Sequence, residues 1–438
     1  MQVPTGMTRD DIVALHRAYV WPPYTSADEH ATRPPLVIVR AEGTWLEDAD
    51  GRRFLDGNAS WWTSALGHRH PRIVRAIRQQ LESLDHSAMA GATNVGAALL
   101  AKELVDVAPK GLVRVHFSDD GSTSVEVAVK LAHQYWAQNG RAERTRFVAL
   151  GGAFHGDTLG AVSLGGVDAF RKVYGPLLFD VMRAPDAGDD ADGWERLVEA
   201  VEAELTRDGD HIAAVVVEPL VQGAAGMRIW PAALLARLRE ATHRADTFLV
   251  CDEVFTGYGR TGRMWASQHA DITPDLLCTA KGFSAGTLPM AATLATERVW
   301  QGFSGGSERA LMHGHTFCGH ALGAAVARET LAVFRDEDVL GGVLRKQELI
   351  ARGFARIGAL PGVVRTRCFG MIGAADLGAG GYGGRIGWRV YEEALARGAY
   401  LRPLGDTVYI TPPLNIVDAE LELLLAVLHD AIAAALGG

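Results

Sequence analysis

Short apolar segments alternate with helical patterns through the middle of this 438-residue chain, and this alternation constrains the fold most. Helical patterns at 122–136 and 231–244 fall between apolar segments. The apolar segments predict strands at 113–117, 147–150, 212–217, 248–252, 276–279 and 291–294. Strands that alternate with helices form a mostly parallel sheet covered on both faces, and ligands bind beyond the carboxyl ends of its strands.

The pattern changes after about residue 328, and a chain of this length suggests two domains. A long helical pattern is followed by short strands at 363–367, 371–375, 400–402 and 408–410 and by a final helix. These elements predict a second, smaller α+β domain, to which we also assign predicted strands between 37 and 56. The expected division is 1–57 and 329–438 for the small domain and 58–328 for the large domain.

Composition narrows the class of protein. The net charge of −9 is spread along the chain, which argues against nucleic acid as a main partner. The longest apolar run, 212–221, is interrupted by Glu218 and Pro219, so no membrane span is expected. The four cysteines show no CxxC spacing, as is typical of reduced thiols. We therefore expect a cytoplasmic globular enzyme.

Two residues near strand ends suggest a particular chemistry. Asp252 ends one predicted strand, and Lys281 follows within the small-residue segment Cys278-Thr279-Ala280-Lys281-Gly282, a setting that none of the other five lysines has. A carboxylate can keep a pyridine nitrogen protonated, and a partly desolvated lysine can bind an aldehyde covalently. Pyridoxal phosphate (PLP) chemistry needs both groups. The alternative is a helix-capping aspartate and a surface lysine.

Turns after other predicted strands supply further candidates. Gly121 and Ser122 begin a predicted helix, whose free N–H groups can bind phosphate, although an ordinary helix cap is the alternative. Phe154 and His155 follow the strand at 147–150, where an aromatic ring can stack on a flat cofactor or simply join the core. Arg402 ends a short strand and can bind a carboxylate or form a surface ion pair.

Two other sequence patterns give weaker evidence for a ligand site. Residues 257–262 match GxGxxG, the fingerprint of dinucleotide-binding enzymes, but no helical pattern opens there. His313, His315 and His320 lack regular metal-ligand spacing, so no metal is predicted.

Together these motifs resemble those of the class III aminotransferases, which depend on PLP. The resemblance covers nearly the whole chain and rests on Val217-Glu218-Pro219, the run from Asp252 to Gly262, and Ala280-Lys281-Gly282. It implies an α/β fold of type I, in which a large domain built on a mostly parallel seven-stranded sheet is joined to a smaller α+β domain. It also implies a homodimer with its active site at the subunit interface, and Lys281 and Asp252 as catalytic residues.

The same resemblance assigns residues to the ligands, which are PLP and a small-molecule keto acid and amino donor. It implies that PLP contacts Gly121, Ser122, Phe154, His155, Glu218, Asp252, Val254, Lys281 and, from the partner subunit, Thr316. It implies that the substrates contact Tyr24, Trp61, Trp62, Phe154, Arg260, Gly314, His315 and Arg402. In this scheme Arg402 binds the carboxylate of the keto acid, and Arg260 lies near the amino donor.

Within the class, several motifs resemble the branch that converts 7-keto-8-aminopelargonate to 7,8-diaminopelargonate in biotin biosynthesis, with S-adenosylmethionine or lysine as donor. They are Trp21-Pro22-Pro23-Tyr24-Thr25-Ser26, Ser60-Trp61-Trp62, His155-Gly156-Asp157-Thr158 and Leu401-Arg402-Pro403-Leu404. The chain departs from that branch at Pro22, Phe154, His315 and His320, and His315 resembles the members that use lysine. The alternatives are a broad ω-amine:pyruvate transaminase of the same fold and a PLP-free binding protein.

Overall fold

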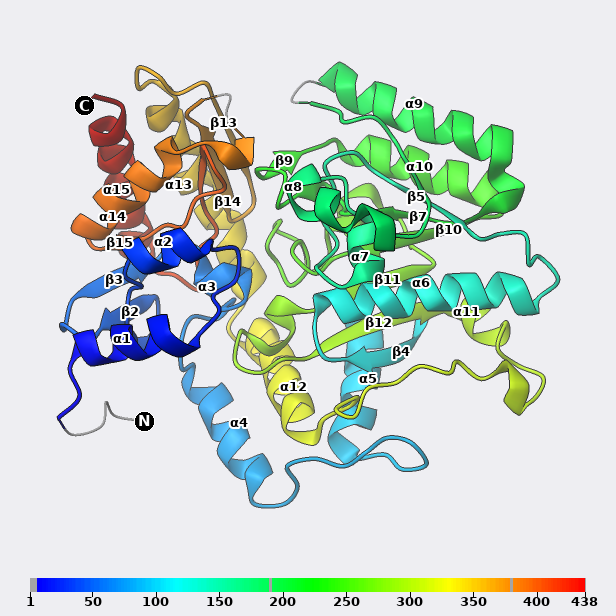
Figure 1. Ribbon diagram of the computed structural model, residues 1–438. Coiled ribbons are helices and arrows are strands. Elements are labelled where there is room, and N and C mark those ends of the chain that lie inside the picture. Colours follow the sequence, from blue (N-terminus) through cyan, green and yellow to red (C-terminus); the bar gives the residue numbers. More distant parts are fainter. Residues whose placement is uncertain (1–5, 189–190, 379–380, 438) are drawn as a thin grey trace.

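The computed structural model describes residues 6–188, 191–378 and 381–437 (Figure 1). Its central element is a seven-stranded sheet in the order β4-β12-β11-β10-β7-β5-β6. β12 runs antiparallel to both neighbours, and all other neighbouring pairs are parallel, which confirms the predicted mostly parallel sheet. The strands are β4 (Leu112–Ser118), β5 (Arg146–Ala149), β6 (Val181–Arg183), β7 (Ile212–Val217), β10 (Phe248–Asp252), β11 (Leu276–Thr279) and β12 (Ala291–Thr296).

Helices cover both faces of this sheet, and the side chains of its strands divide between them. In β7, Ala214 and Val216 pack in the cluster of α6 (Gly121–Gln138). Val215 and Val217 point the other way, into the cluster of α9 (Ala191–Asp208) and α10 (Ala232–Arg244). A strand buried on both faces has no polar alternation, which explains why the sequence shows continuous apolar runs here.

A second group of sheets is built from both ends of the chain. The sheet β1-β2-β3-β15 joins β1 (Ile38–Glu42), β2 (Trp45–Asp48) and β3 (Arg53–Asp56) to β15 (Ala399–Tyr400), which pairs parallel with β3. A three-stranded sheet contains β13 (Arg365–Phe369), β14 (Ile372–Asp376) and β16 (Thr407–Ile410). In Figure 1 the N-terminal strands accordingly lie beside the C-terminal helices α14 (Ile386–Ala396) and α15 (Asp418–Gly437). The exact division at residues 57 and 328 stays a prediction.

The remaining elements connect these sheets. α12 (Ala321–Asp336) packs against α4 (Pro71–Leu81) and α5 (Val95–Val107), and α13 (Val339–Gly358) packs against α15. The shorter elements are α1 (Arg9–Tyr19), α2 (Ala27–Thr32), α3 (Ala59–Trp62), α7 (Leu159–Leu164), α8 (Asp168–Arg171), α11 (Glu297–Gln301), β8 (Val221–Gln222) and β9 (Arg228–Ile229). Among the described residues, no helix combines the length and the apolar character that crossing a membrane requires.

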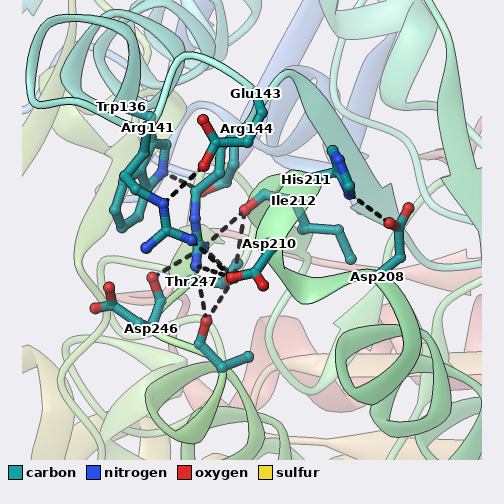
Figure 2. A network of polar contacts seen from close by, with 12 residues as sticks. Trp136, Arg141, Glu143, Arg144, Asp208, Asp210, His211, Ile212, Asp246 and Thr247 are labelled. Carbon is teal, nitrogen blue, oxygen red and sulfur yellow. Dashed lines mark hydrogen bonds and ion pairs between the residues drawn. The ribbon is translucent and has the colours of Figure 1, made fainter.

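A buried arginine ties the amino ends of three strands together (Figure 2). Arg144, which precedes β5, is 1% exposed, and its guanidinium lies over the ring of Trp136 at 4.3 Å from the centroid. The guanidinium donates hydrogen bonds of 2.9–3.1 Å to the carbonyls of Ile212, Ala245 and Asp246 and to the hydroxyl of Thr247. This network fixes β5, β7 and β10 at the edge opposite their carboxyl ends.

Candidate active site

A cavity of about 1130 Å³ opens at the carboxyl ends of the parallel strands. The segments that follow β4, β5, β7, β10 and β11 all contribute to its lining, through Gly121, Phe154, Glu218, Val254 and Lys281 among others. Tyr382 and the segment 402–405 line it from the C-terminal part of the chain. The cavity therefore lies where a parallel α/β sheet binds its ligands.

Asp252, the last residue of β10, is buried in the wall of this cavity. Its Oδ2 lies 2.8 Å from Nδ1 of His155, and its Oδ1 accepts a 3.1 Å hydrogen bond from the N–H of Val254. Both carboxylate oxygens are thus fixed by neighbours, which gives the acid one orientation.

Glu218, just after β7, is a second buried carboxyl group in the cavity. It accepts hydrogen bonds from the N–H groups of Phe154 at 2.9 Å and Gly223 at 3.0 Å. Burial raises the pKa of Glu218 to about 7, with the charge of Asp252 adding to the rise and that of His155 opposing it. Glu218 therefore holds the segment that carries Phe154 and His155 beside the sheet.

Lys281 follows β11 and lies in the same cavity. Its Nζ lies 5.0 Å from the ring centroid of Trp62. Desolvation lowers the pKa of the Lys281 amine, although the negative charges of Asp252 and Glu218 oppose the shift. A lowered pKa increases the fraction of neutral amine, which is the nucleophilic form.

The residues that carry the two tryptophans form a turn of left-handed helix. The φ angles are +46° at Ala59, +44° at Ser60, +64° at Trp61 and +74° at Trp62. The N–H of Trp62 donates to the carbonyl of Asn58 at 2.8 Å, and that of Thr63 donates to Ala59 at 2.9 Å. The left-handed conformation costs about 1–2 kcal/mol for each non-glycine residue, and no local sequence pattern predicts it.

Arg402 supplies a cation to the cavity. Its Cζ lies 4.8 Å from the ring centroid of Trp61 and 5.9 Å from that of Trp388. Within the described ranges, no side chain or carbonyl forms a hydrogen bond or ion pair with this guanidinium. A guanidinium of this kind can bind a carboxylate through two parallel hydrogen bonds.

A tyrosine–aspartate pair lies beside Arg402 and Trp61. The hydroxyl of Tyr24 donates a hydrogen bond to the carboxylate of Asp157, and its ring packs edge-on against Trp61 with centroids 5.5 Å apart. Desolvation raises the pKa of Tyr24 well above its usual range. Asp157 was not predicted as a site residue, although it stands within the motif that supplied His155. Tyr382 and Trp388 were also missed, because nothing local in the sequence connects them to the cavity.

The residues around the start of α6 fit a phosphorylated cofactor. Gly121 and Ser122 are the first residues of the helix, and both line the cavity. A Cβ atom on Gly121 would lie 2.6 Å from Val254, and one on Gly156 would lie 1.8 Å from the Ser122 hydroxyl oxygen. Only glycines allow these segments to approach so closely. The helix start can hold a phosphate, and Asp252 lies in the same cavity to pair with a ring nitrogen.

Four predicted site residues lie outside this cavity. Arg260 is buried, and its guanidinium donates a 2.7 Å hydrogen bond to the carbonyl of Pro412; burial lowers its pKa to about 9. Gly314 and Thr316 are exposed and do not line the cavity of their own chain. His315 reaches it indirectly, since its Nδ1 lies 2.8 Å from the cavity residue Asp119. The roles expected for these residues stay predictions.

The two competing patterns find no support in the structure. The GxGxxG segment at 257–262 forms turns, and no helix opens at it. In the part of the chain that the structure describes, no group of three potential ligand side chains could hold a metal ion.

A type I α/β fold with an aspartate and a lysine in one cavity at its strand ends defines a PLP-dependent enzyme. The model of the class-III aminotransferase family matches residues 25–432, and the chain belongs to this family. It is 41% identical over 441 residues to the adenosylmethionine-8-amino-7-oxononanoate aminotransferase of Geobacter sulfurreducens, covering 96% of this chain and 97% of that one.

Two solved structures are similar throughout. The adenosylmethionine-8-amino-7-oxononanoate aminotransferase of Methanocaldococcus jannaschii superposes with a TM-score of 0.93 at 33% identity, covering 97% of this chain and 99% of that chain. An (S)-enantioselective omega-transaminase from Thermomicrobium roseum gives a TM-score of 0.93 at 27% identity, with 98% and 99% covered. The protein is thus a PLP-dependent aminotransferase.

Proposed function

We propose that the protein transfers an amino group to C7 of 7-keto-8-aminopelargonate and so makes 7,8-diaminopelargonate for biotin biosynthesis. The observation that carries this proposal is Arg402, whose guanidinium stacks on Trp61 without a polar partner in the described chain and shares a cavity with Lys281. A substrate with a carboxylate at one end and a carbonyl near the other needs such a pair. The name of the Geobacter relative, which specifies this keto acid, supports the proposal.

Each cavity residue has a part in this reaction. PLP supplies an aldehyde that takes up amines covalently and a ring that withdraws electrons when its nitrogen is protonated. Asp252 holds that proton, and His155 keeps the carboxylate oriented. With PLP bound, Lys281 would hold the aldehyde, and its Nζ would take up a proton from the donor carbon and deliver one to C7 of the acceptor.

The substrate is bound along one wall of the cavity. Arg402 binds the carboxylate, and the rings of Trp61 and Trp62 cover the aliphatic chain. The carboxylate of Asp157, which accepts from Tyr24, offers a partner for the ammonium group at C8 of the substrate. Phe154 and Val254 also line the cavity, and we assign them to the two faces of the cofactor ring.

We extend the proposal to the donor and the assembly. S-adenosylmethionine is the donor that the relatives' names specify, and lysine is the other candidate because of His315. Thr316 lies exposed on its own chain, which supports a homodimer in which this residue completes the partner's phosphate site. A cytoplasmic location completes the proposal.

Growth of a bacterial strain that lacks its own diaminopelargonate-forming enzyme tests the function. Expression of this protein is expected to restore growth without biotin, and the Lys281→Ala variant is expected not to. Turnover of 7-keto-8-aminopelargonate with S-adenosylmethionine and with lysine in separate assays identifies the donor. Growth that stays dependent on biotin, with soluble wild-type protein present, would contradict the proposal.

The second candidate is a broad ω-amine:pyruvate transaminase, which the similarity to the Thermomicrobium roseum enzyme favours. Enzymes of that class accept plain amines. If this protein is one of them, it is expected to turn over amines that lack a carboxylate efficiently. The biotin-pathway function predicts little turnover of them, because they leave Arg402 without a partner.

A further inference from the structure

The left-handed turn at 59–62 contacts two basic side chains of the cavity, Arg402 and Lys281. Two consecutive side chains contact these two groups. The ring centroid of Trp61 lies 4.8 Å from Cζ of Arg402, and that of Trp62 lies 5.0 Å from Nζ of Lys281. In a strand, consecutive side chains would point to opposite faces. The turn instead directs both rings into one cavity, where one ring lies beside Arg402 and the next beside Lys281.

A buried carboxylate fixes this turn from behind. Asp56 ends β3 and is 0% exposed, and it does not line the cavity. Its Oδ2 accepts a 2.7 Å hydrogen bond from the hydroxyl of Ser60 and lies 2.9 Å from Nε2 of His68. Asp56 thus restrains a residue with φ of +44°, a conformation that serine seldom adopts. Such conformations persist only where the surroundings enforce them.

The same segment also positions the backbone of Arg402. The side-chain oxygen of Asn58 accepts a 2.6 Å hydrogen bond from the N–H of Arg402, and its amide group donates to the carbonyl of Tyr409 at 3.2 Å. The indole N–H of Trp62 donates to the hydroxyl of Tyr409 at 3.1 Å. Hydrogen bonds therefore join the turn to the segment after β15 that carries Arg402, so a shift of the turn is expected to move Arg402 as well.

We propose that Asp56 is a positioning residue that holds the left-handed turn through Ser60 and thereby makes the enzyme selective for the length of a carboxylate-bearing substrate. The selected length is the distance from the carboxylate held at Arg402 to the reacting carbon at Lys281. This inference rests on the carboxylate role proposed above for Arg402.

A length series of ω-amino carboxylates tests the proposal with the cofactor-loaded enzyme. Each compound places an amine and a carboxylate at opposite ends of a straight chain, shorter than, equal to or longer than pelargonate. The rate and the half-saturating concentration of cofactor bleaching are measured for each length. The wild type is expected to show one optimum length. Asp56→Asn and Ser60→Ala are expected to raise the half-saturating concentration at that length about tenfold, equivalent to about 1.4 kcal/mol, and to flatten the preference.

Ser60→Gly separates positioning from direct contact. Alanine and glycine both remove the hydroxyl, but only glycine adopts a positive φ without strain, so it needs less restraint from Asp56. Ser60→Gly is therefore expected to retain more of the length preference than Ser60→Ala. Equal losses in the two variants would assign the effect to a substrate contact of the hydroxyl and would overturn the proposal.

Two further readouts exclude a purely structural role for Asp56. The near-ultraviolet circular dichroism of the tryptophans is expected to change in Asp56→Asn and Ser60→Ala, while bleaching by a plain amine without a carboxylate changes by less than about twofold. Uniform loss for all amines, or an unchanged length optimum, would contradict the proposal. A failure of the proposed function gives a different result. The wild type would then show a length optimum but no response to 7,8-diaminopelargonate.

Discussion

The Nδ1 atom of His155 lies 2.8 Å from Oδ2 of Asp252, and both side chains are buried. His155 lies in the loop that follows β5, and Asp252 is the last residue of β10. In the sheet, only β7 lies between these two strands. The contact fixes the carboxylate in the cavity wall, where it can hold a proton on a ring nitrogen. We therefore expect the electron-withdrawing power of the cofactor to depend on Asp252.

Replacement of Asp252 tests this dependence. Asp252→Asn is expected to lower kcat by about 10²–10⁴-fold, the range typical of losing a group that controls a proton in the reaction. The measurement is kcat for steady-state turnover at saturating cofactor and substrates, with Asp271→Asn, an exposed aspartate outside the cavity, as the control. A kcat within about twofold of wild type would contradict the assigned role.

Lys281 is expected to be the only lysine that binds the cofactor aldehyde. Borohydride reduction of the loaded wild type is expected to fix the cofactor on the peptide that contains Lys281, as mass spectrometry reads directly. Lys281→Ala is expected to lose this adduct and all measurable turnover. Lys102→Ala, which removes an exposed lysine paired with Asp106, is the control and keeps both. An adduct on another lysine of the wild type would refute the assignment.

Arg402 is expected to act on substrates through their carboxylate. Arg402→Met is expected to raise KM for a carboxylate substrate by about 10–100-fold, because a hydrogen bond between charged groups contributes about 1.5–3 kcal/mol. The effect on plain amines is expected to be small. Arg389→Met on α14, an exposed arginine outside the cavity lining, is the matched control. Equal effects on both substrate types would remove the proposed role.

Glu218 is expected to make stability depend on pH in the cofactor-free protein. Its pKa is raised from 4.5 to about 7, so its contribution to stability is complete below about 4.5 and is lost as pH rises through about 7. Over that interval the free energy of unfolding of wild type, relative to Glu218→Gln, is expected to fall by about 3 kcal/mol, since one pKa unit corresponds to about 1.4 kcal/mol. Denaturant unfolding at a series of pH values measures this fall. The same dependence of the unfolding free energy on pH in both proteins would contradict the prediction.

The Arg144 network predicts a loss of stability without a loss of chemistry. Arg144→Met removes the guanidinium donor from the carbonyls of Ile212, Ala245 and Asp246, of which that of Ile212 belongs to a buried residue, at a cost of about 1–3 kcal/mol. Thermal unfolding is expected to occur at a lower temperature, while KM for the substrates stays unchanged below it. Arg141→Met, which removes a more exposed neighbour paired with Glu143, is the control and is expected to have little effect.

Most of the large sheet could be predicted from the sequence because its strands are buried on both faces and read as continuous apolar runs. The strands predicted at 212–217 and 248–252 coincide with β7 and β10. β6 was missed for the converse reason. It is a three-residue edge strand whose last two residues are only partly buried, so it has neither the length nor the apolar pattern of a strand.

The site was predictable where chemistry follows a strand end and unpredictable where it depends on tertiary contacts. Asp252 and Lys281 carry a local signal, and both line the cavity. Tyr382 and Trp388 enter it from the C-terminal part of the chain, and the left-handed turn at 59–62 is bound by Tyr409. No pattern of neighbouring residues encodes such contacts, because the partners are distant in sequence.

The most direct test of the account is the absorbance spectrum of the yellow, cofactor-loaded enzyme during addition of 7,8-diaminopelargonate. This compound is the product of the proposed reaction, so the half-reaction in reverse should convert the cofactor to its amine form. We predict loss of the yellow absorbance at low diamine concentration and a much weaker response in Arg402→Met. No response to the diamine, with ready bleaching by simple amines, would contradict the biotin-pathway function and favour a broad ω-transaminase.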